Sequence, residues 1–406
     1  MSFLKRIGPG PLIAAAFIGP GTVTLCSIAG VQFGFALLWT LLFAIVATGI
    51  LQEMSARLGL ISQKGLSQII REQIDSPVAK ALAVVLIISA VVVGNAAYEA
   101  GNISGAVLGL DGVFGALSLG EGGTNLWALL IGVVAFILLF IGSYKVLERV
   151  LVGLVLFMSL AFVITAIMTK PDMGALFSGL LVPSFPEGSG LILIGLIGTT
   201  IVPYNLFLHA NLVKEKWHNE TDLSATKTDT WVAVLLGGLV SMTIIISAAA
   251  IQGGDIQNVS DLAKALEPLF GQWSKYFIAL GLFAAGITSA VTAPLAAAYV
   301  VKGCLGWESD LRDWNFRAVW MIILIIGVVF SLSGFKPIII IKFAQAANGI
   351  LLPVVAGFLL WIANKKAVLG TYTNSTLQNI LGVAIILITL VLGLKGVFAA
   401  LGMSLF

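Results

Sequence analysis

The stretch Ile18-Gly19-Pro20-Gly21-Thr22-Val23-Thr24 places a proline and two glycines inside an otherwise apolar segment. A second stretch, Thr199-Thr200-Ile201-Val202-Pro203-Tyr204-Asn205, again places a proline within an apolar segment. Proline removes a helix hydrogen bond and clashes with the preceding turn, and flanking glycines or hydroxyl residues make local unwinding easier. Each stretch therefore predicts a helix that is interrupted near its middle, at Pro20 in one and at Pro203 in the other.

The composition around these stretches predicts a membrane protein. Apolar side chains make up 59% of the 406 residues and charged side chains only 10%, whereas a soluble protein carries about 25% charged residues. Apolar runs of about 20 residues, each long enough to cross a hydrocarbon core as a helix, recur along the whole chain. We expect an all-α polytopic membrane protein forming one domain over 1–406, with eleven spans near 11–33, 35–57, 79–108, 125–143, 147–169, 189–213, 228–252, 274–302, 316–334, 339–363 and 377–403.

The positive charges predict how the chain crosses the membrane. With the N-terminus in the cytoplasm, 16 of the 22 Lys and Arg residues fall on the cytoplasmic side, as expected because cytoplasmic loops are enriched in them. The odd number of spans then places the C-terminus outside. We expect an integral membrane protein of the plasma (inner) membrane. The net charge of +3 gives no indication of a nucleic-acid partner.

The spacing of the two interrupted helices predicts a transporter. They are the first and the sixth spans, and interrupted helices at corresponding places in two halves are typical of inverted-repeat transporters with a substrate site near the bilayer midplane. The repeats would cover about 11–169 and 189–363, with a peripheral eleventh helix at about 377–403. Two ordinary proline kinks are the alternative, since membrane helices tolerate them.

Several short stretches resemble the NRAMP family of proton-coupled divalent-metal transporters. They are Phe33-Gly34, Leu38-Trp39, Ser55-Ala56-Arg57-Leu58-Gly59, Pro203, Asn205-Leu206-Phe207-Leu208-His209, Gln345 and Leu352-Pro353. The similarity covers about residues 10–370 in matching order. It implies a LeuT-like fold of five plus five helices, with helices 1 and 6 broken, and secondary active transport by alternating access.

The chain departs from the family at the metal ligands. The family's first break reads Asp-Pro-Gly-Asn, but Gly19 and Thr22 stand at the Asp and Asn positions here. In the sixth helix, Val202 replaces the methionine whose sulfur binds the metal and Thr199 stands at the alanine position, so the amide of Gln345 is the one side-chain ligand retained. Loss of the sulfur removes a preference for thiophilic metals, and loss of the carboxylate removes charge compensation for a divalent cation.

The remaining site is neutral, and we expect its substrate to be a small polar or anionic solute held by residues at the breaks. Free N–H groups at the start of each second half-helix attract an anion. A divalent cation (Mg²⁺ or Mn²⁺/Fe²⁺) is the open alternative, and a channel or a transport-inactive relic is another. The expected substrate-contacting residues are Gly19, Gly21, Thr22, Thr24, Thr199, Thr200, Val202, Tyr204, Asn205, Gln345 and Asn348.

Two ionisable residues inside the spans are candidates for proton coupling. Glu99 matches an acidic position of the family's third helix, and His209 matches a histidine on its intracellular proton route. Charged groups within a membrane are costly and therefore often functional, although structural roles for both residues stay open. Glu53 is expected instead to pair with Arg57, four residues on.

No sequence pattern of an enzyme is present. The chain has no GxxxxGK[ST] loop, no HExxH and no GxSxG. Its two cysteines give neither a disulfide framework nor a metal site, and we expect no cofactor and no resident metal ion.

Overall fold

Apolar α-helices make up most of the protein. The computed structural model describes residues 18–117, 125–142, 145–251, 254–308 and 311–400. The helices are α2 (Pro20–Phe33), α3 (Leu38–Ser62), α4 (Leu66–Glu72), α5 (Pro77–Phe114), α6 (Trp127–Ile141), α7 (Lys145–Met168), α8 (Met173–Leu181), α9 (Gly190–Thr200), α10 (Pro203–Lys216), α11 (Leu223–Ala249), α12 (Val259–Ala263), α13 (Glu267–Phe270), α14 (Ser274–Leu305), α15 (Trp314–Ser331), α16 (Pro337–Ala363), α17 (Lys366–Leu369) and α18 (Thr376–Ala400).

Nine helical segments of the described ranges are long and apolar enough to cross a bilayer. Of the expected spans, the first corresponds to α2, with 14 described residues, and the fourth to α6, with 15, so both fall short of that length. The all-helical membrane class is confirmed, whereas the count of eleven spans stays a prediction. The third span was expected at 79–108, but α5 runs from Pro77, which follows the capping side chain of Ser76, to Phe114.

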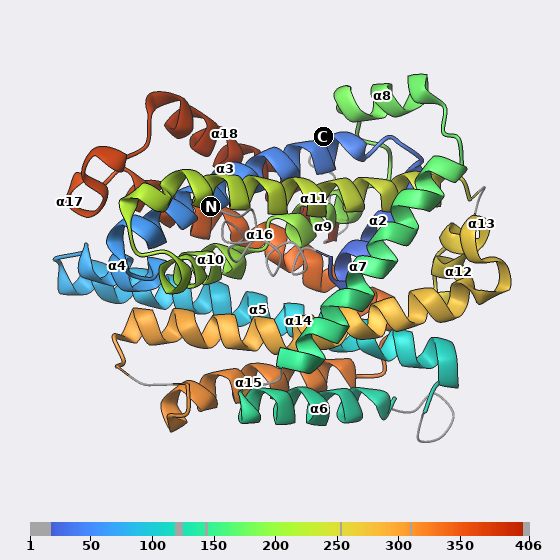
Figure 1. Cartoon of the computed structure of the whole chain (residues 1–406), viewed down its shortest axis with the longest axis horizontal. Coiled ribbons are helices and arrows are strands. Elements are labelled where there is room, and N and C mark those ends of the chain that lie inside the picture. The colour runs from blue at the N-terminus through green and yellow to red at the C-terminus, as the bar shows by residue number, and fades with distance from the viewer. Residues whose placement is uncertain (1–17, 118–124, 143–144, 252–253, 309–310, 401–406) are drawn as a thin grey trace.

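The long helices form a bundle around α5, α9, α14 and α16. Helix α5 packs along α14 and α16, α9 packs against α16, and α2 packs against α11, while α6 and α15 lie together along one edge (Figure 1). At Gly198 the approach is backbone to backbone, because a β-carbon built there would lie 1.9 Å from the backbone oxygen of Gln345. Glycine is therefore required for α9 to reach α16, which carries two of the expected site residues, Gln345 and Asn348.

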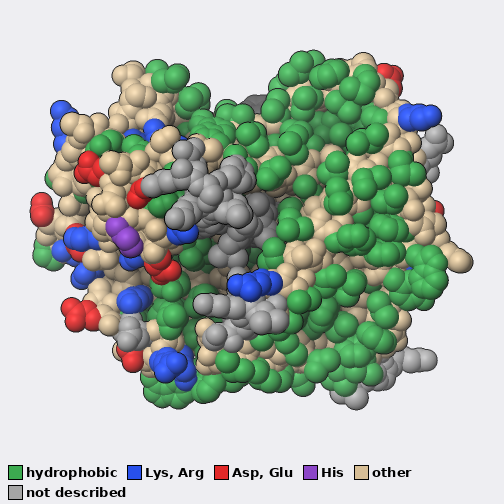
Figure 2. Space-filling view, viewed as in Figure 1, with side chains coloured by type: hydrophobic (Ala, Val, Ile, Leu, Met, Phe, Trp, Pro, Cys, Tyr) green, Lys and Arg blue, Asp and Glu red, His purple; other side chains and the backbone are tan. Residues whose placement is uncertain are grey.

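One end of the bundle carries most of the charge. The short helices α4 and α17 lie at this end, whereas α12 and α13 lie at the other (Figure 1). Figure 2 shows that charged side chains gather at the end with α4 and α17, while hydrophobic side chains cover most of the remaining face. The loops predicted to be cytoplasmic, which carry most of the Lys and Arg residues, meet at this end, and we therefore call it the basic end.

A buried ion pair fixes α3 at the basic end. Arg57 Nε lies 3.3 Å from Glu53 Oε1, as expected, and Lys227 Nζ lies 3.3 Å from the same oxygen. Arg57 also donates to the backbone oxygen of Tyr372 and to Asn374 Oδ1, at 2.6 Å in each case. The pair thus ties the segment before α18 onto α3.

Candidate substrate site

The sixth predicted span is broken where its proline stands. Helix α9 ends at Thr200, α10 begins at Pro203, and Val202 between them is extended, with φ −79° and ψ 118°. In the first predicted span, α2 begins at Pro20 after an extended Gly19. The part of that span before residue 18 lies outside the described residues. The predicted interruption at Pro203 is confirmed, whereas at Pro20 the described residues show only the start of α2.

The two breaks are joined by a hydrogen bond between their threonines. Thr22 Oγ1 lies 2.9 Å from Thr199 Oγ1, across 177 residues of sequence. The side chain of Gln345, on α16, lies directly against Gly21 of α2, because a β-carbon built at Gly21 would lie 2.2 Å from Gln345 Nε2. Gln345 is buried, and its Oε1 accepts no hydrogen bond from any described residue. Three of the expected site residues therefore meet at one buried polar point beside Gly21.

The carbonyl end of α9 points into the same region. The last carbonyls of a helix have no partner within it, and α9 ends with Gly198, Thr199 and Thr200. The Thr200 oxygen accepts only a long bond, 3.4 Å, from Thr48 Oγ1 of α3, while the Thr200 hydroxyl is turned back to the Leu196 oxygen at 2.9 Å. The break thus presents backbone oxygens at the negative end of a helix dipole.

A mainly apolar layer packs around the start of α10, on the side of the break that faces the basic end. It consists of Tyr98, Val202, Tyr204, Leu208, Ala293 and Ala296, with Leu212 and Tyr299 packed against them. The rings of Tyr98 and Tyr204 meet edge to face with centroids 5.5 Å apart. Val202 and Tyr204, which we expected to contact substrate, belong to this layer. We call it the tyrosine layer.

Two side chains that the sequence did not indicate face Gly19. A β-carbon built at Gly19 would lie 3.4 Å from Ser289 Oγ of α14 and 3.6 Å from the Tyr98 hydroxyl of α5. Both are ordinary contact distances, so the space beside Gly19 is bordered by hydroxyl groups. The sequence offered only a weak signal for Ser289, a hydroxyl residue within an apolar span.

Several predicted residues are buried away from this meeting point of α2, α9 and α16. Asn348 lies near Gly94 of α5, and neither its Nδ2 nor that of Asn205 has a described partner. Thr24 is buried with an unpartnered hydroxyl. The structure places these three residues within the protein interior, but no described contact joins them to Thr22 or Thr199.

The two candidates for proton coupling lie between other helices. The stem of Glu99 packs on α15, where a β-carbon built at Gly327 would lie 2.5 Å from Glu99 Cγ. Asn102 Nδ2 donates to Glu99 Oε2 at 3.3 Å, and Glu99 Oε1 has no described partner. His209 Nδ1 lies 2.5 Å from Gln52 Oε1 of α3. The described hydrogen bonds of these two side chains go to Asn102 and Gln52.

A membrane bundle with an interrupted helix whose backbone oxygens face buried polar side chains defines a helical membrane transporter. The model of the natural resistance-associated macrophage protein-like family, Nramp, matches residues 10–399, and the chain belongs to this family. Members of this family are transporters and not enzymes. The resemblance inferred from short stretches of sequence is therefore confirmed.

The chain is similar to proteins named for metal transport. It is 30% identical over 402 residues to a divalent metal cation transporter, MntH, of Pectobacterium carotovorum, covering 96% of this chain and 93% of the relative. It is 30% identical over 395 residues to the MntH of Yersinia pestis, covering 95% and 92%. These relatives favour the divalent-cation alternative over the small polar or anionic solute.

Solved structures show the same fold. A manganese transporter of Eremococcus coleocola superposes with a TM-score of 0.78 at 21% identity, covering 98% of this chain and 86% of that one. MHP1, a nucleobase-cation-symport-1 family transporter, gives 0.59 at 16% identity, covering 98% and 94%. The LeuT-like fold is confirmed by these similarities.

Proposed function

We propose that this protein transports a divalent metal cation across the membrane by alternating access, and that it favours a hard, hydrated cation such as Mg²⁺. The atoms available to bind a cation at the breaks are the observation that carries the proposal. They are all oxygens: the α9 carbonyls, the Thr22 and Thr199 hydroxyls and Gln345 Oε1. Helix C-terminal ends and unwound carbonyls bind cations in transporters of this architecture.

The chemistry of these donors separates hard from soft cations. Val202 lies in the tyrosine layer and supplies no sulfur, so the site has no preference for a thiophilic metal. The described contacts at the breaks include no carboxylate. Magnesium dehydrates reluctantly and keeps several waters, so hydroxyl and carbonyl oxygens can hold it through its own water shell. The lost sulfur and carboxylate are then a change in selectivity within a cation transporter.

A small anionic or zwitterionic solute is the second candidate, and one observation favours it. Helices α2 and α10 both begin at the breaks, at Pro20 and Pro203, and free N–H groups at helix starts attract anions. The relatives count against this candidate, because their names specify divalent metal cations.

Proton coupling, membrane location and orientation complete the proposal. Glu99 and His209 are buried and bonded to Asn102 and Gln52, so each is a candidate to exchange a proton during the cycle. The bacterial relatives support a plasma (inner) membrane location. The gathering of charge at the basic end supports a cytoplasmic position for that end, with the N-terminus inside and the C-terminus outside.

Uptake into proteoliposomes tests the proposal. Purified protein should give saturable Mg²⁺ influx, with Mn²⁺ a weaker competitor, and Thr199→Val should reduce it because the variant keeps the shape of the side chain but removes the hydroxyl. Thr389→Val is the matched control, since Thr389 is a buried threonine of α18 bonded only within its own helix. Stabilisation by amino acids or carboxylates, without any divalent-cation uptake, would instead establish the second candidate.

A further inference from the structure

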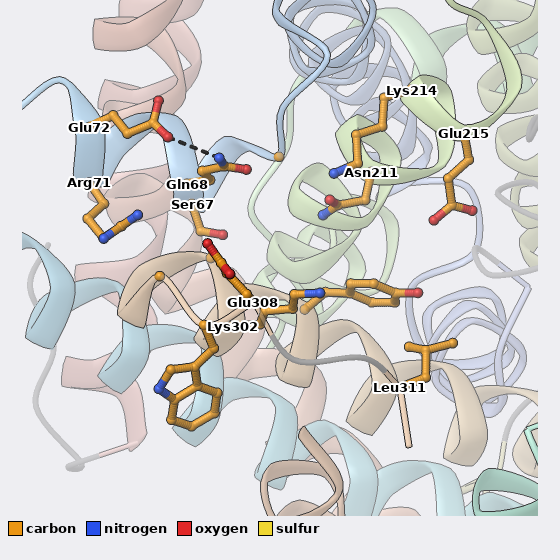
Figure 3. Close-up of a pocket in the computed structure, with 15 residues that line it drawn as sticks. Ser67, Gln68, Arg71, Glu72, Asn211, Lys214, Glu215, Lys302, Glu308 and Leu311 are labelled. Carbon is orange, nitrogen blue, oxygen red and sulfur yellow. Dashed lines mark hydrogen bonds between the residues drawn. The ribbon is translucent and has the colours of Figure 1, made fainter. Parts of the chain in front are cut away.

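A cavity of about 560 Å³ opens at the basic end, away from the helix breaks. Helix α4, the last turn of α10, the end of α14 and the residues that follow α14 enclose it (Figure 3). Its size falls within the range of small-molecule sites, about 300–1,000 Å³. No part of the transport site described above uses this space.

Three positively charged side chains from three different helices line the cavity. They are Arg71 of α4, Lys214 of α10 and Lys302 of α14, and Figure 3 shows them around one space. None of the three forms an ion pair with another described residue. Like charges held close together repel one another, and an anion between them would relieve that repulsion.

The carboxylates of the same cavity offset only part of this charge, because one of them is held by a further lysine, Lys64. The Glu72 carboxylate forms an ion pair with Lys64, whose Nζ lies 2.6 Å from Glu72 Oε2, and it accepts a hydrogen bond from Gln68 Nε2. Burial would raise the pKa of Glu72, but the hydrogen bonds from Lys64 and Gln68 outweigh burial and hold that pKa below its usual value. Glu215 and Glu308 also line the cavity, and Glu215 interacts electrostatically with Lys214. With Glu72 held by Lys64, three cations face these two carboxylates among the described lining residues.

The lining supplies the kinds of hydrogen-bond donor that bind a phosphate group. The guanidinium of Arg71 is held against the turn after α14, because a β-carbon built at Gly306 would lie 2.2 Å from Arg71 Nη1. Arg71 Nε is buried and has no described partner. Ser67 and Asn211 add a hydroxyl and an amide to the lining. A planar fork, ammonium groups and neutral donors that converge are typical of phosphate recognition.

The cavity lies next to the tyrosine layer. Tyr299 lines the cavity and also packs against the tyrosine layer. Helix α10 carries both Lys214 and Tyr204, and α14 carries both Lys302 and Ala296. A ligand that bridges the two lysines would therefore hold α10 against α14, beside this layer.

We propose that this cavity binds a phosphate-bearing anion, and that its occupancy inhibits transport by holding α10 against α14 and α4. The ligand is either a soluble phosphate compound or the headgroup of an anionic phospholipid, since both present the same chemistry. The binding site does not depend on which substrate the protein carries, so its test remains valid if the proposed divalent-cation transport is wrong.

Binding is measured on the full chain in detergent with EDTA present, so that no metal ion can bridge protein and ligand. Inorganic phosphate and ATP are titrated by calorimetry and by thermal shift against chloride of equal ionic strength. Lys214→Gln and Lys302→Gln should each weaken binding about tenfold or more, as expected for loss of one charge-assisted hydrogen bond. Lys216→Gln is the matched control, because Lys216 lies on the last turn of α10 outside the cavity, and it should bind within about twofold of the native affinity.

A second set of measurements distinguishes a lipid headgroup from a soluble anion as the ligand. Protein in nanodiscs of phosphatidylglycerol is compared with protein in phosphatidylcholine, with the same variants. Stabilisation by phosphatidylglycerol alone, lost in Lys302→Gln, assigns the ligand as a lipid headgroup, and stabilisation by ATP or phosphate assigns it as a soluble anion. The proposal is overturned if neither source stabilises the protein more than its control, or if Lys216→Gln weakens binding as much as Lys214→Gln. The inhibitory role of the cavity is refuted, independently of binding, if bound phosphate leaves the uptake rate unchanged.

Discussion

Replacing Gly21 with alanine tests whether Gln345 binds the substrate. Gly21 lies in the first turn of α2, where alanine is favoured over glycine by about 1 kcal/mol, so the helix itself is not harmed. The added β-carbon would lie 2.2 Å from Gln345 Nε2, 2.4 Å from its Cδ and 2.8 Å from its Cγ. The amide must therefore move, and its unpartnered Oε1 moves with it.

The size of the effect follows from the bond that is lost. A hydrogen bond to a charged group contributes about 1.5–3 kcal/mol, which corresponds to about a 10- to 100-fold weaker affinity. We expect Gly21→Ala to raise the KM for divalent-cation uptake by that factor, with an apparent melting temperature close to that of the native protein.

A control variant makes the reasoning refutable. Gly357→Ala adds the same methyl group on α16 with no atom within 4 Å. It should change KM less than about threefold. A Gly21→Ala protein with native KM in the liposome assay would show that Gln345 does not hold the substrate. If Gly21→Ala lowers the melting temperature and leaves KM unchanged, the contact between Gln345 and Gly21 is structural.

Other substitutions separate structural from transport roles. Gly198→Ala should destabilise the protein by about 1–3 kcal/mol, because the methyl group meets the backbone of α16 and not a mobile side chain; a melting temperature equal to that of Gly357→Ala would refute this. Glu53→Gln leaves the buried Arg57 without its carboxylate, which should cost about 3–5 kcal/mol and appear as a lower midpoint in thermal denaturation. Glu99→Gln should keep KM but lower the turnover rate and change its dependence on pH, and native values of both would make Glu99 a structural residue.

The sequence by itself determined the class of the protein and the position of one break. Proline cannot donate the hydrogen bond that a helix interior needs, so Pro203 marks the end of α9 and the start of α10 from local chemistry alone. The membrane class follows in the same way, because the scarcity of charge is a property of composition. The pairing of Glu53 with Arg57 needed only helical periodicity.

Only the tertiary structure decided which polar residues meet. Thr22 and Thr199 are 177 residues apart and bond because α2 and α9 pack together, and Gln345 joins them because glycines at positions 21 and 198 allow close approach. Val202 faces an apolar layer and Glu99 faces α15, neither of which can be read from its neighbours in sequence. Side-chain direction depends on how the helices are rotated against one another, and that rotation is set by packing across the whole bundle.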